Sequence, residues 1–144
     1  MPLVLSAPGA ADAPLRVSGT ASLLDVAPTV LSLLGLETPR EFQGESLLGG
    51  RARMALFFTD YSLGLLGLRD GCTKYIYGLE SGRSKMFDLC RDPDERGDLA
   101  AGRPDRAARY RERLRQWSAA QVARIGRAAE GGRKPNARRV ATGR

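Results

Sequence analysis

The sequence contains no histidine and no long apolar run. Without histidine, the chain cannot form Ser-His-Asp or Cys-His catalytic groups, and it cannot form a histidine-ligated metal site. No apolar run approaches the roughly 18–20 residues that cross a bilayer as a helix. The N-terminal stretch MPLVLSAPGAADAP has no basic region, and its apolar segment is too short for a secretory signal. We therefore expect a soluble, unexported chain with no membrane segment.

Lysine is scarce, and the basic charge is unevenly distributed. Arginine supplies 20 of the 23 basic residues, and the formal net charge is +7. Residues 1–100 carry 10 basic and 13 acidic residues, whereas residues 101–144 carry 13 basic and 3 acidic residues. A basic tail can bind nucleic acid by neutralising phosphates. Aromatic residues do not alternate with these arginines and no recognition-helix pattern accompanies them, so we do not expect a nucleic-acid-binding module.

One short motif approaches a catalytic signature but lacks a required residue. GESLL, at residues 44–48, is similar to a nucleophile elbow, yet Leu48 stands where the second glycine is required. Because the chain has no histidine to activate a serine, we predict that Ser46 is a loop or capping hydroxyl. No glycine-rich phosphate-binding loop is found either.

The acidic segment DPDERGD resembles a calcium-binding loop. Asp92, Asp94 and Gly97 occupy positions 1, 3 and 6 of such a loop. Arg96 and Arg103, however, occupy positions 5 and 12, where oxygen ligands are required. We therefore predict a turn that begins at Asp92 and its following proline, with no metal.

The N-terminal apolar run PLVLS, at residues 2–6, is typical of a strand buried on both faces in a parallel sheet. A parallel neighbour needs a crossover connection of a dozen or more residues. The later strand candidates are joined by short turns and predict an antiparallel meander instead. We therefore expect the first 36 residues to be the edge of a larger sheet whose other strands lie outside this chain. The meander candidates are residues 54–60, 63–69, 73–79 and 84–89.

A helix is predicted between Ser22 and Gly35. Ser22 and Asp25 form a carboxylate version of the capping box. The main helix is expected to begin at Pro28, because proline fits the first turn of a helix. Gly35 suits the left-handed position after the helix, where Leu36 can close back on the last turn. The apolar stripe of this predicted helix consists of Val26, Val30, Leu33 and Leu34.

A second helix is predicted at residues 104–125. Its apolar residues recur at helical spacing, so we expect it to dock on the meander with arginines on its outer face. Trp117 is predicted to be the anchor of this contact. Beyond Gly131 the sequence has no apolar periodicity, and we expect it to be disordered. The apolar stripe consists of Ala107, Tyr110, Leu114 and Trp117.

Two hairpins are predicted in the meander. One turns at Asp70-Gly71, the preferred pair for a tight turn with positive φ. The other is centred on Ser81, so that paired residue numbers sum to 162. The same register places Cys72 opposite Cys90, and both a disulfide and two free thiols are compatible with this placement. The expected cross-strand pairs are Tyr75 with Phe87, Ile76 with Met86, and Lys74 with Asp88.

Five segments together resemble the C-terminal portion of sulfatases of the alkaline-phosphatase-like superfamily. In order, they are PLVLSAPG, SLLDVAPTVLSLLGL, FQGESLL, GLRDGCTKYIYG and MFDLCRDPDERGDLA. The most specific pieces are the D-x-x-PT helix and the YDL-x-x-DP-x-E-x-x-NLA segment. In the latter, Phe87 replaces the usual tyrosine and Asp98 replaces the usual asparagine. The resemblance covers residues 2–117.

The resemblance implies an enzyme that hydrolyses sulfate esters with a calcium ion and a formylglycine made in a C/S-x-P-x-R motif. Neither Cys72 nor Cys90 has that context, and no serine has it. We therefore assign no catalytic, cofactor-binding or metal residue to this chain. The implied partners are a missing N-terminal catalytic portion and a sulfated small molecule or glycan. A full-length relative is expected in the periplasm or outside the cell, where a disulfide persists.

The predicted fold is α/β, or α+β within this fragment. Residues 1–50 are expected to form the edge of a sulfatase core, residues 51–125 a small antiparallel sheet with a C-terminal helix, and residues 126–144 a basic disordered tail. The predicted function is that of a scaffold part, inactive alone, of a sulfatase-like hydrolase. The alternative is a stand-alone interaction or regulatory domain with a basic tail.

Overall fold

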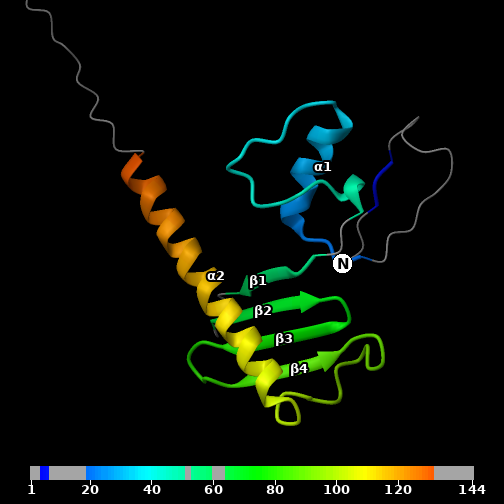
Figure 1. Ribbon diagram of the computed structural model, residues 1–144, viewed down its shortest axis with the longest axis vertical. Coiled ribbons are helices and arrows are strands. Elements are labelled where there is room, and N and C mark those ends of the chain that lie inside the picture. The colour runs from blue at the N-terminus through cyan, green and yellow to red at the C-terminus, as the bar shows by residue number, and fades with distance from the viewer. Residues whose placement is uncertain (1–3, 7–18, 51–52, 60–63, 132–144) are drawn as a thin grey trace, which may run out of the picture.

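The structure, a computed structural model, describes residues 4–6, 19–50, 53–59 and 64–131 of the chain. It consists of a small unit around helix α1 (Val26–Leu33) and a four-stranded sheet that is crossed by helix α2 (Pro104–Gly131), as Figure 1 shows. This mixed architecture confirms the predicted fold class. Within the described residues, no helix combines the length and the apolar character that crossing a membrane requires.

The sheet is an antiparallel meander. Its strands are β1 (Ala55–Thr59), β2 (Leu65–Asp70), β3 (Thr73–Gly78) and β4 (Ser84–Asp88). Their spatial order is β1-β2-β3-β4, the same as their order in sequence. Connections this short cannot make the crossover that a parallel pair needs. The predicted meander is therefore confirmed.

The core lies between one face of this sheet and α2. Leu68, Tyr75 and Met86 face one another across β2, β3 and β4, and each is at most 1% exposed. Tyr110 and Leu114 of α2 cover them, and Leu114 is completely buried. The ring centroids of Tyr75 and Tyr110 lie 5.7 Å apart. Predicted docking of the helix on the meander is thus confirmed.

The predicted anchor of this contact is wrong. Trp117 is only partly buried at the margin of the core, whereas Leu114 lies at its centre. The reason is geometric, because α2 crosses the sheet obliquely and runs on past its edge (Figure 1). The apolar residues of α2 become more exposed along the helix from Leu114 through Trp117. Further along, Val122 and Ile125 are 68% and 69% exposed.

The register predicted for the β3–β4 hairpin is wrong by one residue. Tyr75 lies opposite Met86, and Lys74 lies opposite Phe87, so paired numbers sum to 161. The amide of Gly78 donates a hydrogen bond of 2.9 Å to the carbonyl of Arg83, which closes the four-residue loop 79–82, and Gly82 takes a positive φ of 66°. This register turns Met86 toward α2. Burial of Met86 outweighs the predicted cross-strand pairs, each worth about 0.2–1 kcal/mol.

The predicted turn between β2 and β3 is also displaced by one residue. Asp70 pairs with Thr73, so the two turn residues are Gly71 and Cys72. Gly71 has a φ of 55°, and it occupies the first central position of the turn. Asp70 stays in the strand because its carboxylate accepts a hydrogen bond of 2.7 Å from the Tyr110 hydroxyl of α2.

The N-terminal strand is not formed in the described residues. Residues 4–6 have no regular secondary structure, and Val4 and Leu5 are 86% and 44% exposed. A strand buried on both faces needs neighbours on each side, and the described sheet offers none to this segment. Because the prediction places the partner strands outside this chain, the doubly buried strand stays a prediction for Val4, Leu5 and Ser6, while residues 2–3 lie outside the described part.

Helix α1 begins earlier than predicted but ends as predicted. A 3₁₀ turn, Leu23–Asp25, precedes the helix, so Pro28 is its third residue and not its first. Gly35 has a φ of 68°, and the amide of Leu36 donates a hydrogen bond of 2.9 Å to the carbonyl of Leu31. This is the predicted Schellman ending.

Helix α2 is longer than predicted. It extends to Gly131, so residues 126–131, predicted to be part of a disordered tail, are helical. These residues extend a helix that is already formed, so they need no new nucleus, and arginine, alanine and glutamate among them favour helix. The predicted disorder of residues 132–144 lies outside the described residues.

Candidate functional site

A buried carboxylate organises the N-terminal unit. Asp25 is completely buried, and its side chain accepts hydrogen bonds from the amides of Ser22 at 2.8 Å and Glu45 at 3.0 Å. Its carboxylate also pairs with the guanidinium of Arg53. The Ser22–Asp25 capping box is confirmed, since Ser22 and Asp25 cap each other's backbone. A buried carboxylate is tolerated only with such partners.

Thr29 extends this polar cluster by one helical turn. Its hydroxyl donates a hydrogen bond of 2.6 Å to the carbonyl of Asp25 and accepts one of 3.0 Å from the amide of Leu47. Gly44 lies so close that a Cβ there would be 1.8 Å from the carbonyl oxygen of Leu24. The loop at residues 44–47 is thereby held against the start of α1.

Sequence reasoning recognised Asp25 only as a helix cap. It missed the links from Asp25 and Thr29 to the loop and to Arg53, because these partners lie 18 to 28 residues away. The available signal was the spacing of Asp25 and Thr29, four positions apart in a mostly apolar helical segment, which places them on one face. The D-x-x-PT and GESLL motifs therefore form one structural unit.

Ser46 has a capping role. It is the N-cap of the 3₁₀ turn Leu47–Gly49, and its hydroxyl accepts a hydrogen bond of 3.4 Å from the amide of Leu48. A serine nucleophile needs a neighbouring base and an oxyanion-binding group. The described contacts of Ser46 provide neither, and its predicted capping role is confirmed.

The acidic loop after β4 is a turn, as predicted. The carboxylate of Asp92 accepts a hydrogen bond of 2.8 Å from the amide of Gly97. This bond, together with one from the amide of Arg96, lowers the pKa of Asp92 below its ordinary value. Glu95 points elsewhere and forms an ion pair of 2.6 Å with Lys74. The predicted pairing of Lys74 with Asp88 is replaced by this contact.

Asp98, which stands in place of the family asparagine, ties the loop back to the sheet. Its carboxylate accepts hydrogen bonds from the amides of Met86 at 3.0 Å and Ala100 at 2.9 Å. The next residue, Leu99, donates a hydrogen bond of 2.7 Å to the carbonyl of Met86. An asparagine oxygen can accept the same two bonds, so the substitution preserves this contact.

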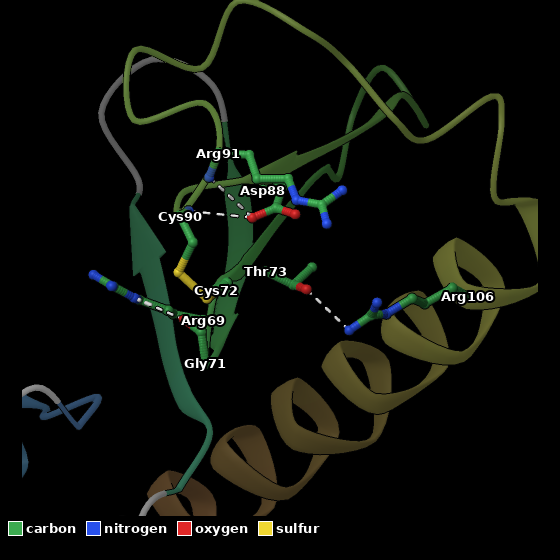
Figure 2. The surroundings of a disulfide bond; sticks show 8 residues. All are labelled: Arg69, Gly71, Cys72, Thr73, Asp88, Cys90, Arg91 and Arg106. Atoms are coloured by element: carbon green, nitrogen blue, oxygen red, sulfur yellow. Dashed lines mark hydrogen bonds between the residues drawn. A yellow bond between two sulfur atoms is a disulfide. The ribbon is translucent and has the colours of Figure 1, made fainter.

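Cys72 and Cys90 form a disulfide (Figure 2), with Cα atoms 5.3 Å apart. Cys72 lies in the β2–β3 turn. In the observed register its carbonyl accepts a hydrogen bond of 2.7 Å from the amide of Leu89. The Asp88 carboxylate then accepts a bond of 3.2 Å from the amide of Cys90, bending the chain back toward Cys72. The observed register places Leu89, and not Cys90, opposite Cys72. The turn after Asp88 nevertheless brings Cys90 within bonding distance of Cys72, so the bridge still forms.

The described residues do not fit a calcium site. Calcium takes six to eight oxygen ligands. The single group of potential ligands in the described part of the chain is Cys72, Asp88 and Cys90, where the two sulfur atoms are bonded to each other. One carboxylate remains, which is too few oxygens for calcium. No step of sulfate-ester hydrolysis can be derived through these residues.

A surface hollow of about 510 Å³ separates the segment at residues 20–23 from the sheet face opposite α2. Phe57, Arg69 and the Lys74–Glu95 ion pair line it. Arg69 also donates a hydrogen bond of 3.2 Å to the carbonyl of Gly71 (Figure 2). These groups can hold an anion or a polar chain segment, but they include no nucleophile with an adjacent base.

Comparison with known proteins gives a consistent result. No family model matches the chain. The chain is 31% identical over 135 residues to arylsulfatase K of Bos taurus, and the aligned region covers 80% of this chain and 25% of that protein. The candidate sulfatase yidJ of Bacteroides fragilis has a similar fold, with a TM-score of 0.52 at 25% identity, over 65% of this chain and 23% of that chain.

A further solved structure shares the fold. It is a protein in complex with its substrate D-glucosamine-2-N,6-O-disulfate, with a TM-score of 0.51 at 22% identity, over 64% of this chain and 22% of that chain. The chain thus spans about a quarter of the length of the proteins it matches. In both sequence and fold, the chain resembles the C-terminal portion of a sulfatase.

Proposed function

We propose that the chain serves as the C-terminal scaffold of a sulfatase-like hydrolase of sulfate esters and has no turnover alone. The observation that carries this proposal is the exposure of apolar residues around α1. Leu34, Leu36 and Leu23 are 66%, 56% and 71% exposed, while the polar residues Asp25 and Thr29 are completely buried. The buried polar side chains of this unit have hydrogen-bond partners within the chain, whereas its apolar side chains are exposed to solvent.

Burial of these side chains favours a partner domain. Each leucine or valine moved fully out of water contributes about 1.5–3 kcal/mol. Five such residues, which also include Leu24 at 50% and Val30 at 43% exposure, lie within 14 positions of the sequence. We propose that an N-terminal catalytic portion covers them. The proposed parts are residues 1–50 at that junction, residues 51–125 as the outer sheet with its helix, and residues 126–144 as a basic tail.

The chemistry belongs to the proposed partner portion. In the sulfatase family, calcium and formylglycine supply the metal charge and the nucleophile for attack on the sulfate ester. The described residues of this chain fit neither group, and we assign them positioning work. Asp25 and Thr29 hold the loop at residues 44–47, while Asp98 and the disulfide hold the loops at one end of the sheet.

The proposed substrate is a sulfated small molecule or glycan. The structural relative that was solved with a disulfated glucosamine supports this class, because it shares the fold. The proposed location of the full-length protein is the periplasm or the extracellular space. The Cys72–Cys90 disulfide supports this location, since disulfides persist in oxidising compartments.

Turnover of an aryl sulfate tests the proposal. We expect the purified chain to release no phenol from 4-nitrophenyl sulfate above a matched blank, with or without calcium. We expect a longer protein, expressed from the same locus together with the coding sequence that lies in frame upstream of Met1, to show turnover. Activity of the purified chain that survives repurification contradicts the proposal, and so does a longer protein that carries the C/S-x-P-x-R motif but has no turnover.

The second candidate is a stand-alone interaction or regulatory domain. The exposed arginines of α2 favour it, since a basic helix can bind a partner without catalysis. The DNA upstream of Met1 separates the two candidates. An open frame that reads into a C/S-x-P-x-R motif supports the enzyme scaffold, whereas an in-frame stop with a ribosome-binding site supports the stand-alone domain.

A further inference from the structure

The exposed arginines of α2 are concentrated on one flank of the helix. At about 100° of rotation per residue, four of them fall within a sector of about 60° beside the sheet contact. All four side chains are exposed. Its first and last members are 18 positions apart, which is about 27 Å along the helix axis. We call this set the basic flank, and its members are Arg109, Arg113, Arg124 and Arg127.

The charge of the basic flank is not neutralised within the described structure. Between Arg106 and Arg127 the sequence holds seven arginines and a single acidic residue, Glu112. Glu112 accepts a hydrogen bond of 3.0 Å from the Gln116 side chain. The ion pairs found among the described residues involve Arg53, Lys74 and Arg96, none of which lies on α2.

Arg106, on the same side of the helix, has a different role. Its guanidinium donates hydrogen bonds of 2.9 Å to the Thr73 and Tyr110 hydroxyls, and it lies 5.3 Å from the centre of the Tyr110 ring. Figure 2 shows it directed at Thr73 in the sheet. Arg124 donates one hydrogen bond to the backbone carbonyl of Glu41. The basic flank is therefore held in place at one end while its other guanidinium groups face solvent.

We propose that the basic flank binds a linear sulfated polysaccharide and so holds a polymeric substrate on the protein. The choice of a sulfated polymer rests on the proposed function. Arg109 and Arg113 lie about 6 Å apart along the axis, within the Debye length of about 8 Å at physiological salt, so their fields add. Guanidinium groups bind oxyanions with paired, charge-assisted hydrogen bonds.

Nucleic acid fits the basic flank less well. Single-stranded nucleic acid binds on exposed aromatic platforms, and the arginines of the flank have no aromatic residue among them in their sector. Trp117, at the border of this sector, is partly buried against the core. Base recognition in a duplex needs a reading element beside the phosphate contacts. A row of guanidinium groups without such an element suits a polyanion that is bound through its anionic groups alone.

Two charge-matched double variants of the full chain test the proposal. Arg109→Gln/Arg113→Gln removes two members of the basic flank. Arg111→Gln/Arg115→Gln removes two exposed arginines from the opposite flank and leaves the same net charge. Binding of fluorescent heparin is measured by anisotropy at physiological salt, with duplex DNA of equal total charge as a second probe. Circular dichroism and thermal unfolding verify that both variants are folded.

We expect the first variant to bind heparin at least tenfold more weakly than the unchanged chain, and the control variant to change less than threefold. Equal losses in both variants overturn the proposal, because affinity then follows net charge. No loss in either variant also overturns it, since another basic segment then binds the polymer. Equal affinity for duplex DNA and heparin overturns the assignment to sulfated polymers. Turnover of a small aryl sulfate by the longer protein tests the proposed function separately.

Discussion

Gly44 lies where the loop at residues 44–47 meets the start of α1. A Cβ at this position would be 1.8 Å from the Leu24 carbonyl oxygen, a contact that only a shift of the backbone can relieve. Such overpacking costs about 1–3 kcal/mol. The same shift would pull Glu45 and Leu47 away from Asp25 and Thr29. The absence of a Cβ at Gly44 thus allows the polar cluster to form.

Gly44→Ala is therefore expected to lower the free energy of unfolding of the N-terminal unit by about 1–3 kcal/mol. Hydrogen exchange at the amides of Glu45 and Leu47 measures the change where it occurs. Gly49→Ala is the matched control, because a Cβ at Gly49 meets no atom within 4 Å. Equal exchange rates in the two variants would contradict the assigned contact.

Tyr110 joins α2 to the β2–β3 turn. Burial, followed by the hydrogen bond to Asp70, raises the pKa of Tyr110 above its ordinary value of 10.0. Burial also raises the pKa of Tyr75 beside it. A group whose pKa is raised on folding stabilises the fold fully below its unfolded pKa. That stability is lost as the pH rises through the folded pKa.

We therefore expect the free energy of unfolding to fall as the pH rises above about 10. Urea unfolding at a series of alkaline pH values measures this decline. Tyr110→Phe should weaken the pH dependence. It should also cost about 1–3 kcal/mol at neutral pH, because Asp70 loses its donor. An unchanged alkaline profile in the variant would show that Tyr110 does not contribute.

Among the elements, α2 contributes most of the cover for the sheet. Leu114 is completely buried in the core, whereas Trp117 is partly buried at its edge. Leu114→Ala should cost about 2–5 kcal/mol, because it leaves a cavity between helix and sheet. Trp117→Ala should cost less than Leu114→Ala. Urea unfolding followed by circular dichroism ranks the two, and the reverse order would contradict the placement of the helix.

The disulfide stabilises the hairpin of β3 and β4. It closes a loop with a sequence separation of 18 residues, which corresponds to about 3 kcal/mol of stability in the chain-entropy account. Reduction by dithiothreitol should lower the free energy of unfolding by this amount, which is measured as a lower urea midpoint. A Cys72→Ser/Cys90→Ser variant should start from the lower midpoint and show no response to the reductant. A response that persists in this variant would point to another cause.

At the scale of the whole molecule, the apolar surface around α1 is uncovered. Leu34 and Leu36 are 66% and 56% exposed on the unit proposed to contact the catalytic portion. We expect the purified chain to bind the dye ANS at this surface. Leu34→Ser/Leu36→Ser should reduce dye fluorescence at least twofold, whereas Val122→Ser/Ile125→Ser on α2 should reduce it less. Equal reductions would locate the uncovered surface elsewhere.

The sequence determined those features that depend on local chemistry. Short apolar runs with tight connections specify a meander, because no crossover fits between them. The Ser22–Asp25 box and Gly35 mark the two ends of the α1 region through backbone hydrogen bonds a few residues long. The roles of Ser46 as a cap and Asp92 as a turn residue follow from the same local rules.

Only the tertiary structure decided the features that depend on packing between distant segments. The register of β3 and β4 follows the burial of Met86 under α2, a contact that cross-strand pairing rules do not consider. The oblique path of α2 makes Leu114 the anchor in place of Trp117. Asp25 reaches Glu45 and Arg53 because Gly44 lets two backbones touch. Side-chain volume and the direction of approach set these outcomes, and local sequence patterns carry neither.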